Sequence, residues 1–179
     1  MKIPALKTKR MVLSALFLAL GMVLPLLTMQ IKEVGDTLLP MHLPVMLCGF
    51  VCGGWYGLAV GLVLPFLRSV CFGMPPLFPN AVWMAAELAT YGAVTGFLYK
   101  DVFKQKLWWM YSSLISAMIA GRIVWGITKA ALLIPRGKTF TLQAFVAGGF
   151  ADALPGIVLQ LVLIPPIVKL LEKREENVL

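Results

Sequence analysis

Five ionisable side chains lie inside stretches of this chain that are otherwise apolar enough for lipid: Arg68, Glu87, Arg122, Lys129 and Asp152. A charge at the centre of a bilayer costs about 2.5–3.5 kcal/mol on insertion scales. Such residues therefore face a protein interior or a wet cavity, and they tend to pair with one another. The pattern predicts a membrane protein with a polar site inside its helical bundle.

The composition agrees with a membrane location. The chain has 179 residues, of which 60% are hydrophobic and 13% are charged, and its mean hydropathy is +0.88. Soluble domains contain about 25% charged residues, and a chain of this length cannot hide so much apolar surface from water. We interpret the apolar run after Arg10 as a permanent span, because it is long and no small-residue cleavage pattern follows it.

The apolar runs predict an all-α integral membrane protein, with one domain over residues 1–179 and six transmembrane helices. About 20 apolar residues cross the hydrocarbon core, and the expected spans cover residues 10–28, 41–54, 55–72, 80–99, 107–134 and 142–171. Glycines in the second and third spans indicate close packing between these two helices. Pro155 and Gly156 interrupt the sixth span, either as a packing kink or as a bend that faces a ligand.

The distribution of basic residues predicts the orientation. Six spans place both termini on one side of the membrane. The N-terminal segment carries four basic residues, and the segment 100–106 carries three basic residues and one acidic residue. Because basic residues collect in cytoplasmic loops, we expect a cell-membrane protein with both termini in the cytoplasm, and we do not attribute the net charge of +8 to nucleic-acid binding.

No motif for catalysis, nucleotide binding or metal binding is recognisable. Cys48 and Cys52 share a helix face, but no histidine stands at a metal-binding spacing, so we expect packing residues rather than a thiolate metal pair. An intramembrane enzyme would need a nucleophile with a base, or a metal set. We therefore predict no cofactor, no metal and no enzymatic activity.

The direction of each span sets the depth of each buried charge, at about 1.5 Å per residue. All five charges are expected in the outer half of the membrane or near its midplane. Polar and aromatic side chains share these depths, among them Asn80, Trp83, Tyr91 and Trp125. Apolar walls with a few fixed polar groups and rings are typical of small-molecule pockets.

Two other interpretations of these charges stay open. Glu87, Arg122 and Asp152 could form only an interhelical salt bridge, or the charges could belong to a proton relay, which usually needs several acids or histidines in series. The five residues include three positive and two negative charges. A carbonyl, a carboxylate or water would satisfy the surplus positive charge.

Four segments of the chain resemble a known family. The first helix contains Met11-Val-Leu-Ser-Ala15-Leu-Phe-Leu-Ala19, and Met41-His-Leu-Pro-Val45 opens the second span. With Gly73-Met-Pro-Pro-Leu-Phe-Pro79 and Pro155-Gly-Ile-Val-Leu-Gln160, the layout resembles the substrate-binding S components of energy-coupling-factor (ECF) vitamin transporters. The similarity is to the branch that contains the riboflavin and pantothenate carriers, and it covers essentially the full chain.

The resemblance implies the substrate-binding subunit of an ATP-driven importer. Such a subunit captures a vitamin outside the cell, docks on a transmembrane coupling subunit with two ATPase subunits, and delivers the vitamin inward by toppling. The chain lacks the phosphate-binding Gly-x-x-x-x-Gly-Lys pattern, so ATP hydrolysis is expected in those partners. Ala15 and Ala19 match the family's small-residue motif and would face the coupling subunit.

The resemblance also places the ligand pocket in spans four to six. Glu87 and Arg122 would orient the polar edge of the ligand, and Trp83, Tyr91 or Trp125 would stack on a ring. The full predicted set is Asn80, Trp83, Glu87, Tyr91, Arg122, Trp125, Lys129 and Asp152. His42 is expected in a lid or in packing, and Arg68 is expected to hold the outer loop.

The lining favours a flat heteroaromatic vitamin or precursor, such as a flavin, a pyrimidine, a benzimidazole riboside or a queuosine precursor. The surplus positive charge keeps pantothenate, a carboxylate, as an alternative. A self-sufficient secondary carrier is a competing class. Many such carriers have broken helices in matching halves, whereas this chain shows a break only in its sixth span.

Overall fold

The computed structural model describes residues 3–27, 37–102, 107–137 and 139–176, and within these ranges every regular element is helical. The α-helices are α1 (Ile3–Leu27), α3 (His42–Cys52), α4 (Gly54–Phe72), α5 (Val82–Gly96), α6 (Leu107–Leu133), α7 (Leu142–Val146) and α8 (Leu154–Glu176). Short π-helical or 3-10 segments extend them: η1 (Leu77–Ala81), η2 (Phe97–Val102), η3 (Ile134–Arg136) and η4 (Ala147–Ala151). Residues 1–2 and 103–106, which carry part of the predicted cytoplasmic charge, lie outside the described ranges.

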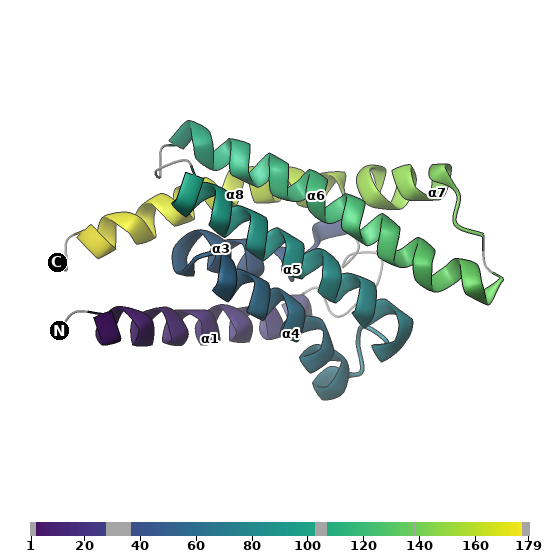
Figure 1. Ribbon diagram of the computed structural model, residues 1–179, viewed down its shortest axis with the longest axis horizontal. Coiled ribbons are helices and arrows are strands. Elements are labelled where there is room, and N and C mark those ends of the chain that lie inside the picture. Colours follow the sequence, from purple (N-terminus) through teal and green to yellow (C-terminus); the bar gives the residue numbers. More distant parts are fainter. Residues whose placement is uncertain (1–2, 28–36, 103–106, 138, 177–179) are drawn as a thin grey trace.

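The long helices form an elongated bundle with both termini at the same end (Figure 1). Helix α5 packs against α3, α4 and α6, while α1 packs against α3 and α4. Helix α8 lies against α3 and α6. Side chains on α3, α5 and α6 are therefore placed to meet in the interior.

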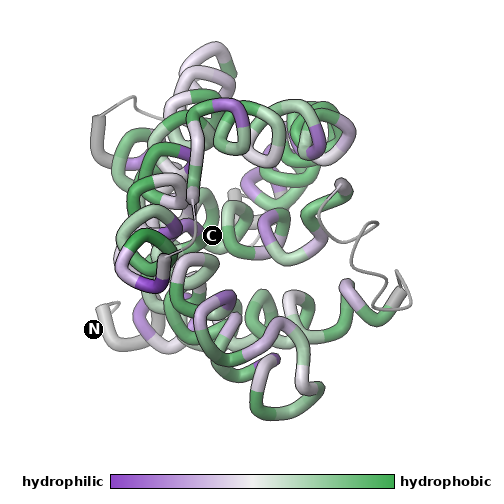
Figure 2. The backbone as a smooth tube through the Cα atoms, turned by 90° about the vertical axis from the view of Figure 1, so that its right-hand side faces the viewer, coloured by the Kyte–Doolittle hydropathy of each residue, from purple (hydrophilic) through white to green (hydrophobic). Residues whose placement is uncertain are grey.

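Apolar residues dominate the helices of the bundle when it is viewed along its long axis (Figure 2). Among the described residues, five helical stretches are long and apolar enough to cross a membrane: Lys7–Leu26, Gly54–Phe72, Leu77–Lys100, Leu107–Arg136 and Leu142–Lys173. Helix α3 is apolar but has only 11 residues, which is short of the ~20 that a full crossing needs. The molecule is an all-α membrane bundle of the class that the sequence predicts.

Glycines bring α4 and α5 into backbone contact. A Cβ atom on Gly92 of α5 would lie 2.2 Å from the carbonyl oxygen of Gly57 in α4, and a Cβ on Gly61 would lie 2.4 Å from the backbone of Leu88. Small residues permit such close approach between helices in lipid. We predicted this crowding between the second and third spans; Gly49 and Gly57 do approach each other, but both also face α5.

The regular helix of the predicted sixth span is interrupted at residues 152–153. Helix α7 and η4 end at Ala151, and α8 begins at Leu154, so Pro155 falls in the first turn of α8. Proline is well tolerated there because the first-turn N–H groups lack an intrahelical partner. A Cβ on Gly156 would lie 2.6 Å from the carbonyl oxygen of Thr37. Gly156 therefore packs against the segment before α3.

Candidate ligand-binding site

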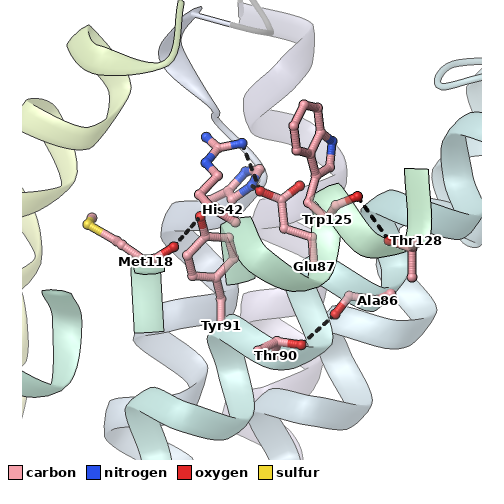
Figure 3. A network of polar contacts seen from close by, with 9 residues as sticks. His42, Ala86, Glu87, Thr90, Tyr91, Met118, Trp125 and Thr128 are labelled. Atoms are coloured by element: carbon pink, nitrogen blue, oxygen red, sulfur yellow. Dashed lines mark hydrogen bonds and ion pairs between the residues drawn. The ribbon is translucent and has the colours of Figure 1, made fainter. Parts of the chain in front are cut away.

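Three helices bring a histidine, a carboxylate and a guanidinium together in the interior (Figure 3). His42 is the first residue of α3, Glu87 lies in α5 and Arg122 lies in α6. Arg122 Nη1 is 2.9 Å from Glu87 Oε1, and His42 Nε2 is 3.4 Å from the same oxygen. The carboxylate of Glu87 is thus the centre of the cluster, with nitrogen groups from two other helices around it.

The cluster is almost completely removed from solvent. The exposed fractions of His42, Glu87 and Arg122 are 2%, 2% and 3%. A buried carboxylate and a buried guanidinium each lose hydration worth several kcal/mol, so each ion is tolerated only with a partner of opposite charge. Their ion pair supplies that partner and links α5 to α6.

The pairing leaves several polar atoms over. Among the described residues, Arg122 Nε and Nη2 and His42 Nδ1 have no hydrogen-bond partner, and the contacts of Glu87 Oε1 with Arg122 Nη1 and His42 Nε2 are close charged contacts without hydrogen-bond geometry. An unsatisfied buried donor costs about 1–3 kcal/mol, and more when it is charged. The interior of the bundle therefore holds donors whose partner is not another described side chain or backbone group.

Tyr91 forms one wall of the cluster. Its ring meets that of His42 edge to face, with 5.1 Å between centroids, and its hydroxyl donates a long 3.4 Å hydrogen bond to the carbonyl of Met118 (Figure 3). Gly121 makes room for this ring, since a Cβ there would lie 2.9 Å from it. The packing of α5 on α6 thus fixes both Tyr91 and Gly121, which precedes Arg122 in the chain.

An aromatic group continues from the cluster along α6. Lys129 Nζ lies 4.3 Å from the ring centroid of Trp125, 5.4 Å from that of Phe140 and 5.5 Å from that of Trp83. These distances are within the range of cation–π attraction. The Arg122 guanidinium carbon is 6.0 Å from the Trp125 ring, so Trp125 connects the charged cluster with the lysine and its rings.

The structure brings together six of the eight predicted ligand-binding residues: Trp83, Glu87, Tyr91, Arg122, Trp125 and Lys129. Within the described ranges, the other two form no ring, charge or hydrogen-bond contact with these six. Asn80 is half-buried in η1, and Asp152 is exposed in the turn between η4 and α8. Among the described residues, neither of these two side chains forms a hydrogen bond or ion pair with the cluster.

Two residues expected at the edge of the site have definite positions. We predicted His42 in a lid or in packing, yet it contacts Glu87 directly. Counting about 1.5 Å per residue from the start of its predicted span placed His42 nearer the outer edge than Glu87, so residue depth gave no signal of this contact. Arg68 lies elsewhere: it donates to the carbonyl of Met22 in α1 and packs over Phe72.

Other parts of the described chain add no second site of this kind. No group of three histidine, cysteine or acidic side chains is placed to hold a metal ion within the described ranges. A hollow of about 350 Å³ lies near the end of the bundle that carries the termini, lined by Arg10, Cys52, Gly53, Gly54, Trp55, Tyr56, Phe97 and Lys100. It contains no residue of the cluster.

A family model for the substrate-specific component of ECF transporters matches residues 9–168. The chain belongs to this family. No curated protein and no solved structure gives a significant match. As a substrate-specific component, the protein is a membrane subunit that binds a small molecule, is not an enzyme, and works with partners of an ECF module.

Proposed function

We propose that this ECF component captures a small heteroaromatic vitamin or vitamin precursor outside the cell, and that an ATP-driven module moves it inward by toppling the component in the membrane. The observation that carries the proposal is the buried cluster of His42, Glu87 and Arg122 beside aromatic rings. Buried charged groups in a bundle of largely apolar helices are of the kind that recognises a polar ligand.

The charged and the aromatic side chains have different roles in the proposed binding. Glu87 and Arg122 offer an acceptor and donors for the polar edge of the ligand. Trp125, with 7% of its surface exposed, and the half-buried Trp83 offer faces on which a flat ring can stack. Pantothenate is a second candidate ligand, because Arg122 and the neighbouring Lys129 would attract its carboxylate.

One face of α1 is available for docking on the coupling subunit. Ala15 and Ala19 are exposed, while Ser14 and Phe17 are buried against the bundle. A small-residue face permits close helix contact in lipid. We assign this face to the coupling subunit, and the two ATPase subunits would bind to that subunit rather than to this chain.

Both termini are assigned to the cytoplasm. Trp55 and Trp108 begin α4 and α6 and are 73% and 79% exposed, as expected for residues at a membrane interface. Arg10 and Lys100 line the hollow at the same end of the bundle. Basic residues and exposed tryptophans at one end favour the cytoplasmic interface there, which puts the charged cluster toward the outer half.

The test combines binding and transport. The purified chain is titrated with riboflavin and pantothenate in detergent, and then reconstituted in liposomes with and without the coupling module and ATP. We expect binding by the chain alone and uptake only with the module and ATP. Uptake by the chain alone would instead identify a self-sufficient carrier.

Docking variants make the test specific. Ala15→Trp and Ala19→Trp should abolish ATP-driven uptake and leave ligand binding unchanged, because they enlarge the α1 face far from the charged cluster. Ile119→Trp is the matched control, since Ile119 is 50% exposed on α6 and should retain both activities. Equal loss of uptake in the control would remove the assignment of this face.

A further inference from the structure

Within the part of the chain that the structure describes, the guanidinium of Arg122 is paired at one of its ends. Its Nη1 group is 2.9 Å from Glu87 Oε1. Its Nε and Nη2 groups have no hydrogen-bond partner among the described residues, although Arg122 is only 3% exposed. The two donors without a partner are thus buried in the middle of the bundle, beside Trp125.

These two donors form one recognition edge. In a guanidinium, the Nε–H and the nearer Nη2–H point the same way in one plane, as a rigid fork. Such a fork matches two acceptor atoms held side by side on a planar group, and it binds them with two parallel hydrogen bonds. A single acceptor would satisfy only half of it.

The geometry points to a ligand with two adjacent acceptors on one planar edge, bound by Arg122 through Nε and Nη2. The acceptors are the two oxygens of a carboxylate, or a carbonyl oxygen next to a ring nitrogen in a heteroaromatic compound. This inference rests on the proposed function and narrows its substrate class. Glu87 acts as the positioning residue, because its contact with Nη1 turns the other edge of the guanidinium away from itself.

The surroundings of the fork favour a planar ligand. The guanidinium carbon is 6.0 Å from the Trp125 ring, and the ring of Tyr91 stands on the other side of the cluster, against His42. Aromatic rings beside the cluster favour a flat ligand group over a tetrahedral one. Leaving two charged donors buried without acceptors is costly, so the bound ligand would relieve this cost as it enters.

Matched ligand pairs test the fork. The neutral arm compares riboflavin with 5-deazariboflavin and 1-deazariboflavin, each of which replaces by C–H one ring nitrogen beside a carbonyl. The carboxylate arm compares pantothenate with panthenol, in which an alcohol replaces the carboxylate. Dissociation constants are measured by titration calorimetry with the full chain in detergent.

We expect the parent protein to prefer the two-acceptor member of one pair by about 10- to 100-fold, the range for one hydrogen bond to a charged group. Arg122→Lys keeps the positive charge but has no fork, so the preference should fall at least tenfold. Arg68→Lys is the matched control, a second buried arginine whose contacts are to α1 and Phe72, and it should keep the full preference. The arm that shows the preference identifies which acceptor pair the protein reads.

The contrary outcomes separate this inference from the proposed function. Tight binding without preference in either arm, or a preference that survives in Arg122→Lys, overturns the fork and leaves the transport role intact. Absence of binding by every compound overturns the two-acceptor class. The transport role then depends on the α1 docking variants, which do not involve Arg122. The comparison of ligands in the parent protein needs no variant, so it decides the matter even if Arg122→Lys does not fold.

Discussion

The ion pair between Glu87 and Arg122 should be strongly coupled energetically. Its atoms are 2.9 Å apart, so at an effective dielectric constant of about 20 the attraction is about 6 kcal/mol. Removing one partner leaves the other ion buried, and this costs about 3–5 kcal/mol of unfolding free energy. We therefore expect Glu87→Gln and Arg122→Gln each to lower the stability by about this amount.

The double variant isolates the pair. With both charges removed, no buried ion remains, so the double variant should lose about 2–3 kcal/mol less than the sum of the single losses. Reversible unfolding of the ligand-free chain in mixed detergent micelles measures all four free energies. Glu87→Gln combined with Arg68→Gln is the control and should be additive within about 0.5 kcal/mol. Additivity in the Glu87–Arg122 cycle would refute the argument that these two residues neutralise each other.

Three further predictions test the packing, the ring stacking and the orientation. Gly92→Ala should cost about 1–3 kcal/mol of stability by thermal unfolding, because its Cβ would lie 2.2 Å from the carbonyl oxygen of Gly57. Gly148→Ala is the control and should cost less, because its Cβ would lie 3.4 Å from its nearest neighbour. Trp125→Phe should remove most of the ligand-induced change in tryptophan fluorescence, and the same substitution at the exposed Trp108 should preserve it; the reverse result would exclude stacking on Trp125. An impermeant maleimide added to intact cells should label the exposed Cys71 near the outer end of α4 and not the buried Cys48; labelling only after cell lysis would reverse the assigned orientation.

The helical membrane class was predictable because it depends on composition and run length. An apolar stretch of about 20 residues has few alternatives to a membrane helix, and the structure has helices in each predicted span. The partner of a glycine was harder to predict. Because small residues mark close helix contacts in lipid, the sequence identifies Gly57 as an interface residue. It does not reveal that Gly57 faces Gly92 of α5 as well as Gly49 of the neighbouring helix α3.

The depth of a residue was a better guide to the site than its charge. Glu87 and Arg122 meet because their spans run in opposite directions and place them at one level. The same calculation placed Asp152 nearby, but it assumed a continuous sixth helix. Asp152 lies in the short interruption between η4 and α8, and its side chain is exposed.

His42 shows what a search for charged residues overlooks. A histidine is neutral or charged according to its surroundings, so it did not stand out among the buried ions, yet it completes the shell around Glu87. If this shell served only to stabilise the fold, it would be complete once every ion had a partner. Here Glu87 receives contacts from two helices, while two donors of Arg122 receive none from the described residues. A cluster that only joined helices would gain by spreading its acceptors over its donors, so the unequal distribution supports the proposed ligand site.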